Sequence, residues 1–497
     1  MASRAGVFVS EKPTPMLSPV TASAALPVFV GTAPINQRYT KDEVLQGKGL
    51  EPVLAFSYEE AVQKLGYKEP SRMGDKTVFM HTLCMAAAVQ FGLYQSGPAV
   101  FINVFGADPA HIEPLPPEDV PLVDGRLSDE TLEMMGRLFL ETLVVKPEDE
   151  STTYEEGVDY VVSFTASGRV SFALVDGGAI GPDDTLKISG DALRIDNLDP
   201  SDMVGGYDAL TGRKTGLELV SDVFPRWGLV PGLISVPMYG AYPEIAAVML
   251  AKSQNINGVF RAMSVVPLYP ESGYTSAVEV KKDANIFDPQ QLCVYGSILV
   301  GNRVDDFSPH LTGLIGRTDS DNNDIPYVSP LNKRLQSNGM YDIELESSQF
   351  LGLDQANFLL ANGIITALNF SGGWRAWGDN TAAYPSNTDP KDSSISNRRM
   401  FNWVENSIIL TCWQFVGRPM GLPLIQTITD TLNSWFDGLR NSGAIAGGRV
   451  EFREASNPTT DLLANRITFD VFVTPTPTAA EINFPVTYDP SYLQFGE

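Results

Sequence analysis

Residues 466–489 read Arg-Ile-Thr-Phe-Asp-Val-Phe-Val-Thr-Pro-Thr-Pro-Thr-Ala-Ala-Glu-Ile-Asn-Phe-Pro-Val-Thr-Tyr-Asp and contain the most regular pattern in this chain. Apart from Phe472, apolar and polar side chains alternate in each half, which is the period of a strand with one buried face. The apolar positions are Ile467, Phe469, Val471 and Val473 in the first half and Ile482, Phe484, Val486 and Tyr488 in the second. The pattern predicts two half-buried strands.

The link between these strands, residues 475–480, is too long and too rich in proline for a tight two-residue hairpin. The last strand can therefore extend away from the body of the protein. Pro485 lies inside it and cannot donate to a ladder, so the strand is expected at the margin of a sheet. That sheet need not belong to the same chain.

Upstream, strand-like and helix-like segments alternate, which predicts a mixed α/β layer. Strands are expected at 27–31 and 100–105, and helices at 57–65, where Ser57 and Glu60 form a capping box, and at 77–94. From about residue 150 the pattern changes to short apolar runs separated by Ser167-Gly168 and Gly177-Gly178. These runs predict a small all-β insertion, after which the α/β alternation resumes near residue 205.

Two helices are expected in the last quarter, at 397–416 and 423–441. The second carries an apolar stripe from Ile425 to Leu439, while Asp430, Asp437 and Arg440 lie on its opposite face. Such a stripe usually contacts the core and such a polar face is usually only solvated. The alternative is that the helix docks a partner.

At the other end of the chain, the extended run Gly6-Val7-Phe8-Val9-Ser10 is followed by prolines at 13, 15 and 19, which indicate a loose arm. These patterns divide the chain into six segments. They are an N-terminal arm (1–22), an α/β region (23–149), a β-rich insertion (150–203), an α/β middle domain (204–362), a C-terminal domain (363–479) and a C-terminal arm (480–497).

Composition excludes several classes of function. The 497 residues exceed what one core usually serves, so several domains are expected. The net charge of −25 repels phosphate, which argues against binding nucleic acid or an anionic membrane. The longest apolar stretches, near 82–94 and 408–416, are too short to span a bilayer, and the first residues lack the pattern of a signal peptide. We expect assembly in the cytoplasm and no membrane insertion.

No motif for catalysis or for a cofactor is found. His81, His111 and His310 lie far apart without metal-ligand spacing, and no Gly-x-Ser-x-Gly elbow occurs. Cys84, Cys293 and Cys412 lie in apolar runs and are expected as buried free thiols. We predict no catalytic, cofactor-binding or metal-binding residues.

Two loops imitate ligand-binding motifs. The segment from Gly206 to Thr215 resembles a phosphate loop but has five residues between its glycines, so it is predicted to be a turn before a helix. The segment from Asp319 to Pro330 begins like a calcium loop but lacks the turning glycine and the closing glutamate, so it is predicted to be a polar loop.

Several segments taken together resemble the contractile phage tail sheath family, which also serves phage-tail-like bacteriocins and contractile injection systems. Their order and spacing agree from one end of the chain to the other, although each motif alone is degenerate. The segments are Gly6–Glu11, Pro27–Gly31, Val204–Leu217, Val230–Pro237, Ile364–Gly378, the helix containing Phe401, Val404, Glu405 and Ile408, and Phe469–Tyr488 with Ala480-Glu481-Ile482.

The resemblance implies a multi-domain sheath fold with an α/β core and a structural, non-enzymatic subunit. Such subunits form stacked hexameric rings around an inner tail tube, contract to drive the tube through a target cell envelope, and meet baseplate and tail terminator proteins. The two arms of each subunit would exchange strands with neighbouring subunits. The predicted exchange residues are Val7, Phe8, Val9, Ile482, Phe484, Val486 and Tyr488, and the predicted tube-facing residues are Asp430, Asp437 and Arg440.

The implied location is the tail of a virion or of a tail-like particle, with the β insertion facing outward. Two alternatives remain at this point. One is an α/β hydrolase-like enzyme whose motif is not recognised, with residues 204–267 as its catalytic core. The other is a different structural subunit, such as a tube or capsid protein.

Overall fold

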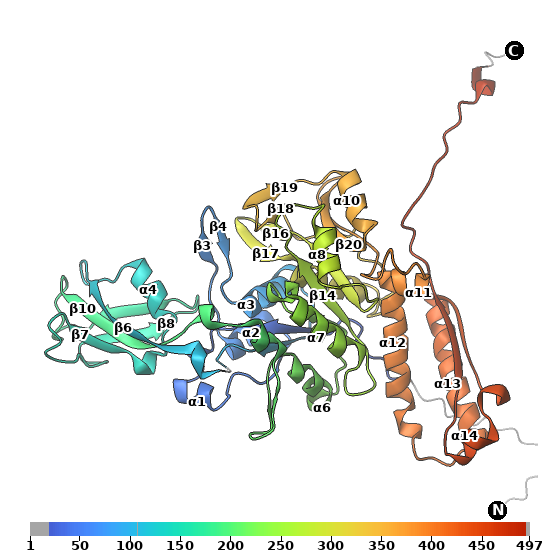
Figure 1. Ribbon diagram of the computed structural model, residues 1–497, viewed down its shortest axis with the longest axis horizontal. Helices are drawn as coiled ribbons and strands as arrows, with labels where there is room; N and C mark the ends of the chain where they lie inside the picture. The colour runs from blue at the N-terminus through green and yellow to red at the C-terminus, as the bar shows by residue number, and fades with distance from the viewer. Residues whose placement is uncertain (1–18, 107, 494–497) are drawn as a thin grey trace, which may run out of the picture.

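The computed structural model describes residues 19–106 and 108–493 (Figure 1). A β-rich unit lies at one end of the elongated molecule, an α/β core in the middle and a helical unit at the other end, from which the C-terminal segment projects. The mixed α/β class predicted from the sequence is confirmed. Val7, Phe8 and Val9 lie outside the described residues.

An eight-stranded sheet forms the centre of the core, in the order β2-β5-β1-β13-β14-β15-β20-β21. The neighbours from β5 to β20 are parallel, and β2 and β21 join antiparallel at the edges. The strands are β1 (Pro27–Gly31), β2 (Val53–Ala55), β5 (Ala99–Asn103), β13 (Leu233–Ser235), β14 (Met263–Leu268), β15 (Gln291–Tyr295), β20 (Ile364–Asn369) and β21 (Trp374–Trp377). The inner strands are continuous apolar runs because both of their faces are buried.

Helices cover this sheet. The predicted helix at 57–65 is α2 (Tyr58–Leu65), whose N-cap Ser57 accepts from the Glu60 amide, while the Glu60 carboxylate accepts from the Phe56 amide. The helix predicted at 77–94 begins later, as α3 (Thr82–Ala87) and a π-helical continuation (Ala88–Leu93), because residues 76–78 pair in a strand. The other helices around the core are α1 (Lys41–Leu45), α5 (Pro200–Val204), α6 (Val223–Trp227), α7 (Pro243–Gln254), α8 (Ala277–Asp283), α9 (Phe307–Ser320), α10 (Leu353–Leu360) and α11 (Pro390–Ser393).

A second sheet, which the sequence patterns did not predict, packs beside the first. It has six strands in the order β19-β18-β16-β17-β4-β3. They are β3 (Ser71–Met73), β4 (Lys76–Val78), β16 (Ser297–Val300), β17 (Arg303–Asp306), β18 (Gly339–Asp342) and β19 (Ser347–Gln349). Each is too short to show a clear alternation, and strands from distant parts of the chain are combined.

The β-rich unit has its own apolar core. Its sheet β6-β10-β7 joins β6 (Ile112–Pro121), β7 (Val144–Pro147) and β10 (Thr185–Leu193), and β8 (Tyr160–Phe164) pairs with β9 (Val170–Leu174); the unit also contains α4 (Asp129–Met135). Since β6 and β7 precede residue 150, we place the start of the insertion near residue 112. The division of the chain into domains stays a prediction.

The helical unit consists of α12 (Ile395–Cys412), α13 (Leu422–Asn441), the strands β22 (Ile445–Glu451) and β23 (Asp470–Pro475), and α14 (Thr459–Leu463). Ile428, Leu432 and Leu439 of the predicted stripe are buried and belong to the same apolar cluster as one face of the central sheet. The stripe is therefore a core contact.

A buried ion pair joins α12 to the α/β core. Arg399 donates from both terminal nitrogens to the carboxylate of Asp319 in the last turn of α9, with one distance of 3.0 Å, and the two side chains are only 3% and 2% exposed. Burial raises the pKa of Asp319, although the neighbouring guanidinium opposes this. The segment predicted to be a polar calcium-like loop thus begins inside a helix with a structural ion pair.

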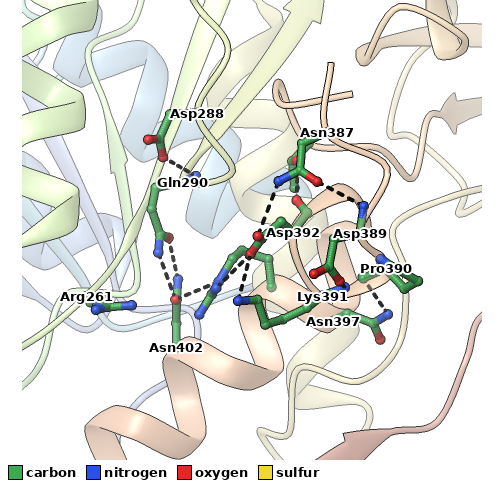
Figure 2. A network of polar contacts seen from close by, with 12 residues as sticks. Arg261, Asp288, Gln290, Asn387, Asp389, Pro390, Lys391, Asp392, Asn397 and Asn402 are labelled. Atoms are coloured by element: carbon green, nitrogen blue, oxygen red, sulfur yellow. Dashed lines mark hydrogen bonds and ion pairs between the residues drawn. The ribbon is translucent and has the colours of Figure 1, made fainter. Parts of the chain in front are cut away.

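A polar network beside this pair also fastens α12 (Figure 2). Arg398 donates to Asp392 at 3.1 Å, to Asn402 at 3.1 Å and to Glu405 at 3.3 Å. The amides of Asn402 and Gln290 exchange two hydrogen bonds, at 2.7 and 3.1 Å. Because Arg398, Asn402 and Gln290 find partners in this network, it holds α12 in position on the core.

Asp379 lies in the segment that connects β21 to α11 and is 8% exposed. Its carboxylate accepts from the Ser329 hydroxyl, and its carbonyl accepts from the amide of Ile395, the first residue of α12. Burial raises the pKa of Asp379 to about 6. A carboxyl that resists ionisation is thus part of the joint at the start of α12.

Replacing Arg399 by Met should lower the free energy of unfolding by about 3–5 kcal/mol, because it leaves the Asp319 carboxylate buried without its partner. Urea denaturation measures the change. The matched control is Arg317→Met, which breaks the exposed pair between Arg317 of α9 and Asp321, the C-cap of α9. This change should cost at most about 1 kcal/mol. Equal effects of the two substitutions would contradict the role of the buried pair.

Replacing Asp379 by Asn should change how stability depends on pH. Because folding raises the pKa of Asp379, the folded state holds its proton more tightly, so the group lowers the free energy of unfolding as pH rises from about 4 to about 6. The full loss is of the order of 3 kcal/mol. Asp379→Asn should therefore gain stability relative to the parent over this range, as measured by urea denaturation from pH 4 to 8. A pH-independent difference would contradict the assignment, and Asp321→Asn is the exposed control.

Candidate functional site

The C-terminal arm, described to residue 493, and the residues 476–479 that lead into it leave the helical unit and run into solvent (Figure 1). Three contacts hold the root of the arm. The Thr476 amide donates to the Ala444 carbonyl at 3.2 Å, the Thr476 hydroxyl donates to the Gly443 carbonyl at 2.6 Å, and the hydroxyls of Thr478 and Ser396 lie 3.1 Å apart. Beyond Thr478, the hydrogen bonds described for the arm stay within the arm itself. The arm therefore makes no polar contact with the rest of the described chain past its root.

The prediction of a half-buried strand over the second half of 466–489 is wrong for the single chain. Its residues form no strand, and the apolar face is open: Ile482 is 67% exposed, Phe484 82%, Val486 94% and Tyr488 75%. An isolated extended segment has no partner for its backbone groups, so neither a ladder nor a buried face can form. The first half is confirmed in shorter form as β23.

The pair β22-β23 is a sheet of only two strands within the described chain. One face packs on α13, where Val450 is buried and Val473 half-buried against the same core. On the other face, the guanidinium groups of Arg449 and Arg453 lie 4.2 and 4.7 Å from the centre of the Phe472 ring. Phe472 breaks the alternation in the sequence because it belongs to this outer face.

One edge of the small sheet is partly closed. The Asn433 side chain on α13 donates to the Val450 carbonyl at 3.1 Å and accepts from the Val450 amide at 2.7 Å, so it occupies both backbone groups of this residue. Just before β23, the Asn457 side chain likewise donates to the Thr468 carbonyl and accepts from the Thr468 amide. For residues 471–474 of β23, no hydrogen bond outside the β22 ladder is described. The middle of β23 is thus an open edge, the kind of site that accepts an additional strand.

The polar face of α13 is exposed, as predicted. Asp430, Asp437 and Arg440 all face solvent, whereas Asn433 on the same face is bonded to β22. Sequence reasoning missed β22 and the role of Asn433. The two glycines at 447 and 448 weaken the strand pattern of β22, and a single asparagine carries no signal of the backbone that it will meet.

The histidines have structural environments. His310 lies between the Tyr94 hydroxyl (3.3 Å to Nδ1) and the Asp305 carboxylate (3.2 Å to Nε2), and all three side chains are buried. Burial opposes ionisation of Asp305, but hydrogen bonds from His310 and Arg303 outweigh it and lower its pKa. This resembles a catalytic relay in composition, yet none of the described cavities is lined by any of the three.

The other candidates for chemistry are also accounted for by packing. Burial lowers the pKa of His81 to about 3, and His111 is bonded to Asp202 at 3.1 Å. Cys84 and Cys293 are buried free thiols, and Cys412 is half-buried. The glycine-rich loop at 206–215 is the short hairpin of β11 (Tyr207–Asp208) and β12 (Arg213–Lys214) before a 3-10 helix.

Two kinds of feature are absent from the described residues. No group of three or more His, Cys, Asp or Glu side chains is arranged to hold a metal ion there. None of the helices in that part of the chain is long and apolar enough to cross a membrane.

Comparison with known proteins gives a relative that spans nearly the whole chain. The tail sheath protein of Burkholderia phage BcepMu is 24% identical over 505 aligned residues, which cover 98% of this chain and 97% of that protein. No family model matches.

Solved structures share the fold. A chain of the anti-feeding prophage baseplate superposes with a TM-score of 0.57 at 15% identity, over 98% of this chain and all of that one. The helical sheath of the same particle in its contracted state gives 0.55 at 16% identity, again over 98% and 100%. The resemblance to tail sheath proteins seen in the sequence is thereby confirmed.

Proposed function

We propose that this chain is a structural subunit of a contractile tail sheath and not an enzyme. Subunits polymerise as stacked hexameric rings around an inner tail tube and contract to drive the tube through a target cell envelope. The observation that carries the proposal is the C-terminal arm: an extended segment with an exposed apolar face, attached beside a two-stranded sheet with an open edge. The named relatives support the same reading.

The arm and the open edge are complementary. The arm offers unpaired backbone groups and four apolar side chains on one face, Ile482, Phe484, Val486 and Tyr488. The middle of β23 offers a strand edge without a partner among the described residues. When the arm of one subunit joins the β22-β23 pair of the next, both sets of backbone groups are satisfied. The arm and the β23 edge that receives it lie on different surfaces of the subunit, so the contact is head-to-tail. Such contacts generate rings or helical polymers.

Strand addition suits a lattice that changes shape. Hydrogen bonds hold the added strand and its alternate side chains fix the register, while the segment beyond the last anchor at Thr478 lets each subunit turn relative to the next. The work of contraction comes from the lattice itself: an extended assembly held behind a kinetic barrier relaxes to tighter packing of nearly rigid subunits. The baseplate triggers the change, and a tail terminator closes the other end.

The N-terminal arm donates a second strand to a neighbouring subunit, through Val7, Phe8 and Val9. The exposed polar face of α13 contacts the tube through Asp430, Asp437 and Arg440. We place the assembled protein in the tail of a virion or of a tail-like particle, formed in the host cytoplasm.

Deleting residues 480–497, or residues 1–12, should leave a folded monomer with an unchanged melting temperature but abolish polymers. Residues 480–493 make no hydrogen bond to the described chain before Thr478, so we expect only assembly to depend on them, and we expect the same of residues 1–12. Analytical sedimentation and electron microscopy measure the outcome. Wide hollow cylinders are expected only from the full-length chain and not from the truncated chains. Normal polymers from either truncated chain would contradict the proposal.

A matched pair of full-length variants refines this test. Phe484→Asp with Val486→Asp places two charges on the apolar face of the arm, and Asn483→Asp with Thr487→Asp places the same two charges on the polar face. Only the first pair should block polymerisation, because its side chains must be buried in the neighbour. Equal polymerisation of both pairs would exclude the proposed orientation of the strand.

Reversing charge on α13, with Asp430→Lys and Asp437→Lys, should weaken binding to the tube protein at least tenfold in a pull-down, because it inverts the field of the contact face. The control is Glu130→Lys with Asp176→Lys, two exposed acids on the β insertion that change the net charge equally. Unchanged tube binding by the α13 variant, or equal loss in the control, would remove this helix from the tube interface.

A further inference from the structure

A small cavity of about 20 Å³ lies where the β-rich unit joins the α/β core. The core supplies one wall, and the β-rich unit supplies the other through residues that follow α4 and residues at the end of β10. The lining residues are Asn36, Lys68, Met80, His81 and Phe105 from the core, and Gly136, Arg137, Leu193 and Ile195 from the unit. A volume of this size holds one water molecule or one ion of similar size.

Two nitrogen atoms of the lining are buried and have no hydrogen-bond partner among the described residues. They are Nδ1 of His81 and Nε of Arg137. His81 is only 9% exposed, whereas Arg137 is half-buried and its Nε alone is closed off from solvent. A buried donor without an acceptor is costly, so an occupant that accepts hydrogen bonds from these nitrogens stabilises the site.

The wall of the cavity carries more positive than negative charge. The Lys68 ammonium lies 2.8 Å from the Glu133 carboxylate, but no carboxylate within ion-pair distance of Arg137 is found in the described part of the chain. One of the two cations therefore lacks a counter-ion there. A methyl group on Gly136 would lie 3.3 Å from the Lys68 nitrogen, so the glycine leaves the ammonium room beside the cavity.

The protonation of His81 agrees with these surroundings. Burial, followed by the nearby charges of Lys68 and Arg137, lowers the pKa of His81 to about 3, so its ring is neutral at neutral pH. A neutral imidazole carries one proton, which can lie on Nδ1. In that tautomer His81 donates a hydrogen bond into the cavity without adding a third positive charge.

We propose that the cavity binds one halide ion, chloride in ordinary buffers, through Nε of Arg137 and Nδ1 of His81. A halide accepts from both nitrogens and offsets the unpaired charge of Arg137. A water molecule would bring two protons that need acceptors, and the buried side-chain atoms without partners in this lining are nitrogens only. A polyatomic anion such as phosphate is too large for the volume.

The bound ion connects two parts of the fold, because His81 belongs to the core and Arg137 to the β-rich unit. Direct hydrogen bonds cross the same joint: the Asn36 side-chain amide donates to the Gly136 carbonyl at 3.1 Å and to the Leu138 carbonyl at 2.9 Å. A halide adds an electrostatic link beside these bonds. This assignment does not depend on the proposed sheath function, because all of the groups belong to one chain.

Thermal unfolding of the full-length chain in sodium chloride, compared with sodium gluconate at equal ionic strength, tests the site. Gluconate is too large to enter the cavity. The melting temperature should rise with chloride concentration and then level off, as binding to the folded state alone requires. Bromide should replace chloride. The proposal is overturned if chloride adds no such saturable rise, and water is then the occupant.

Two matched variants separate binding from the general effect of salt on stability. Arg137→Met removes the charged donor, and Arg126→Met removes an exposed arginine of the same unit, so both lose one positive charge. The chloride-dependent rise should vanish in the first variant and persist in the second. Equal behaviour of the two variants would overturn the assignment of Arg137.

A direct measurement does not depend on unfolding. Chlorine-35 NMR of the folded full-length chain should show a broadened line that added bromide narrows, and His81→Phe should weaken chloride binding about tenfold, as expected for one hydrogen bond to a charged group. Crystals soaked in sodium bromide should give an anomalous peak in contact with Arg137 and His81. An anomalous peak elsewhere, a peak without line broadening in solution, or unchanged binding by His81→Phe would refute the two-donor site.

Discussion

Unpaired backbone in an extended chain is the constraint on which this molecule depends. A peptide group in a strand must hydrogen-bond to another strand or to water, and a two-stranded sheet leaves two edges open. In the described chain, Asn433 and Asn457 close parts of these edges with side-chain amides, while the middle of β23 and the arm after Thr478 stay without protein partners. When subunits assemble, the backbone groups of the arm and those of the β23 edge can hydrogen-bond to each other.

Helix α12 connects this incomplete pairing to the rest of the protein. The C-terminal arm is attached near its first turn through Ser396, and the N-terminal segment near its last turn through Thr411, positions separated by roughly 22 Å at 1.5 Å per residue. Between them, the buried pair of Arg399 with Asp319 and the network around Arg398 fix the helix to the α/β core. A pull on either arm is therefore transmitted to a rigid body rather than absorbed by a loose helix.

Much of the local structure could be predicted from the chain alone. Continuous apolar runs marked the buried strands β1 and β5, and the stripe on α13 was correctly assigned to the core, because these features depend on period and polarity. The six-stranded second sheet could not be predicted. It combines short strands from residues 71–78 and 297–349, and no local pattern records which distant strands will pair.

The features of the candidate site likewise fall into those that the sequence predicts and those that only the structure shows. The sequence by itself determined that residues 482–488 form an extended ribbon with one apolar face, since alternation and Pro485 are properties of neighbouring residues, and it determined the acidic charge and the lack of catalytic motifs. Only the tertiary structure decided that this ribbon finds no strand to pair with among the described residues of its own chain and that β22 exists as a partner for β23. These facts concern groups far apart in the sequence, and their proximity is set by packing, which neighbouring residues do not encode.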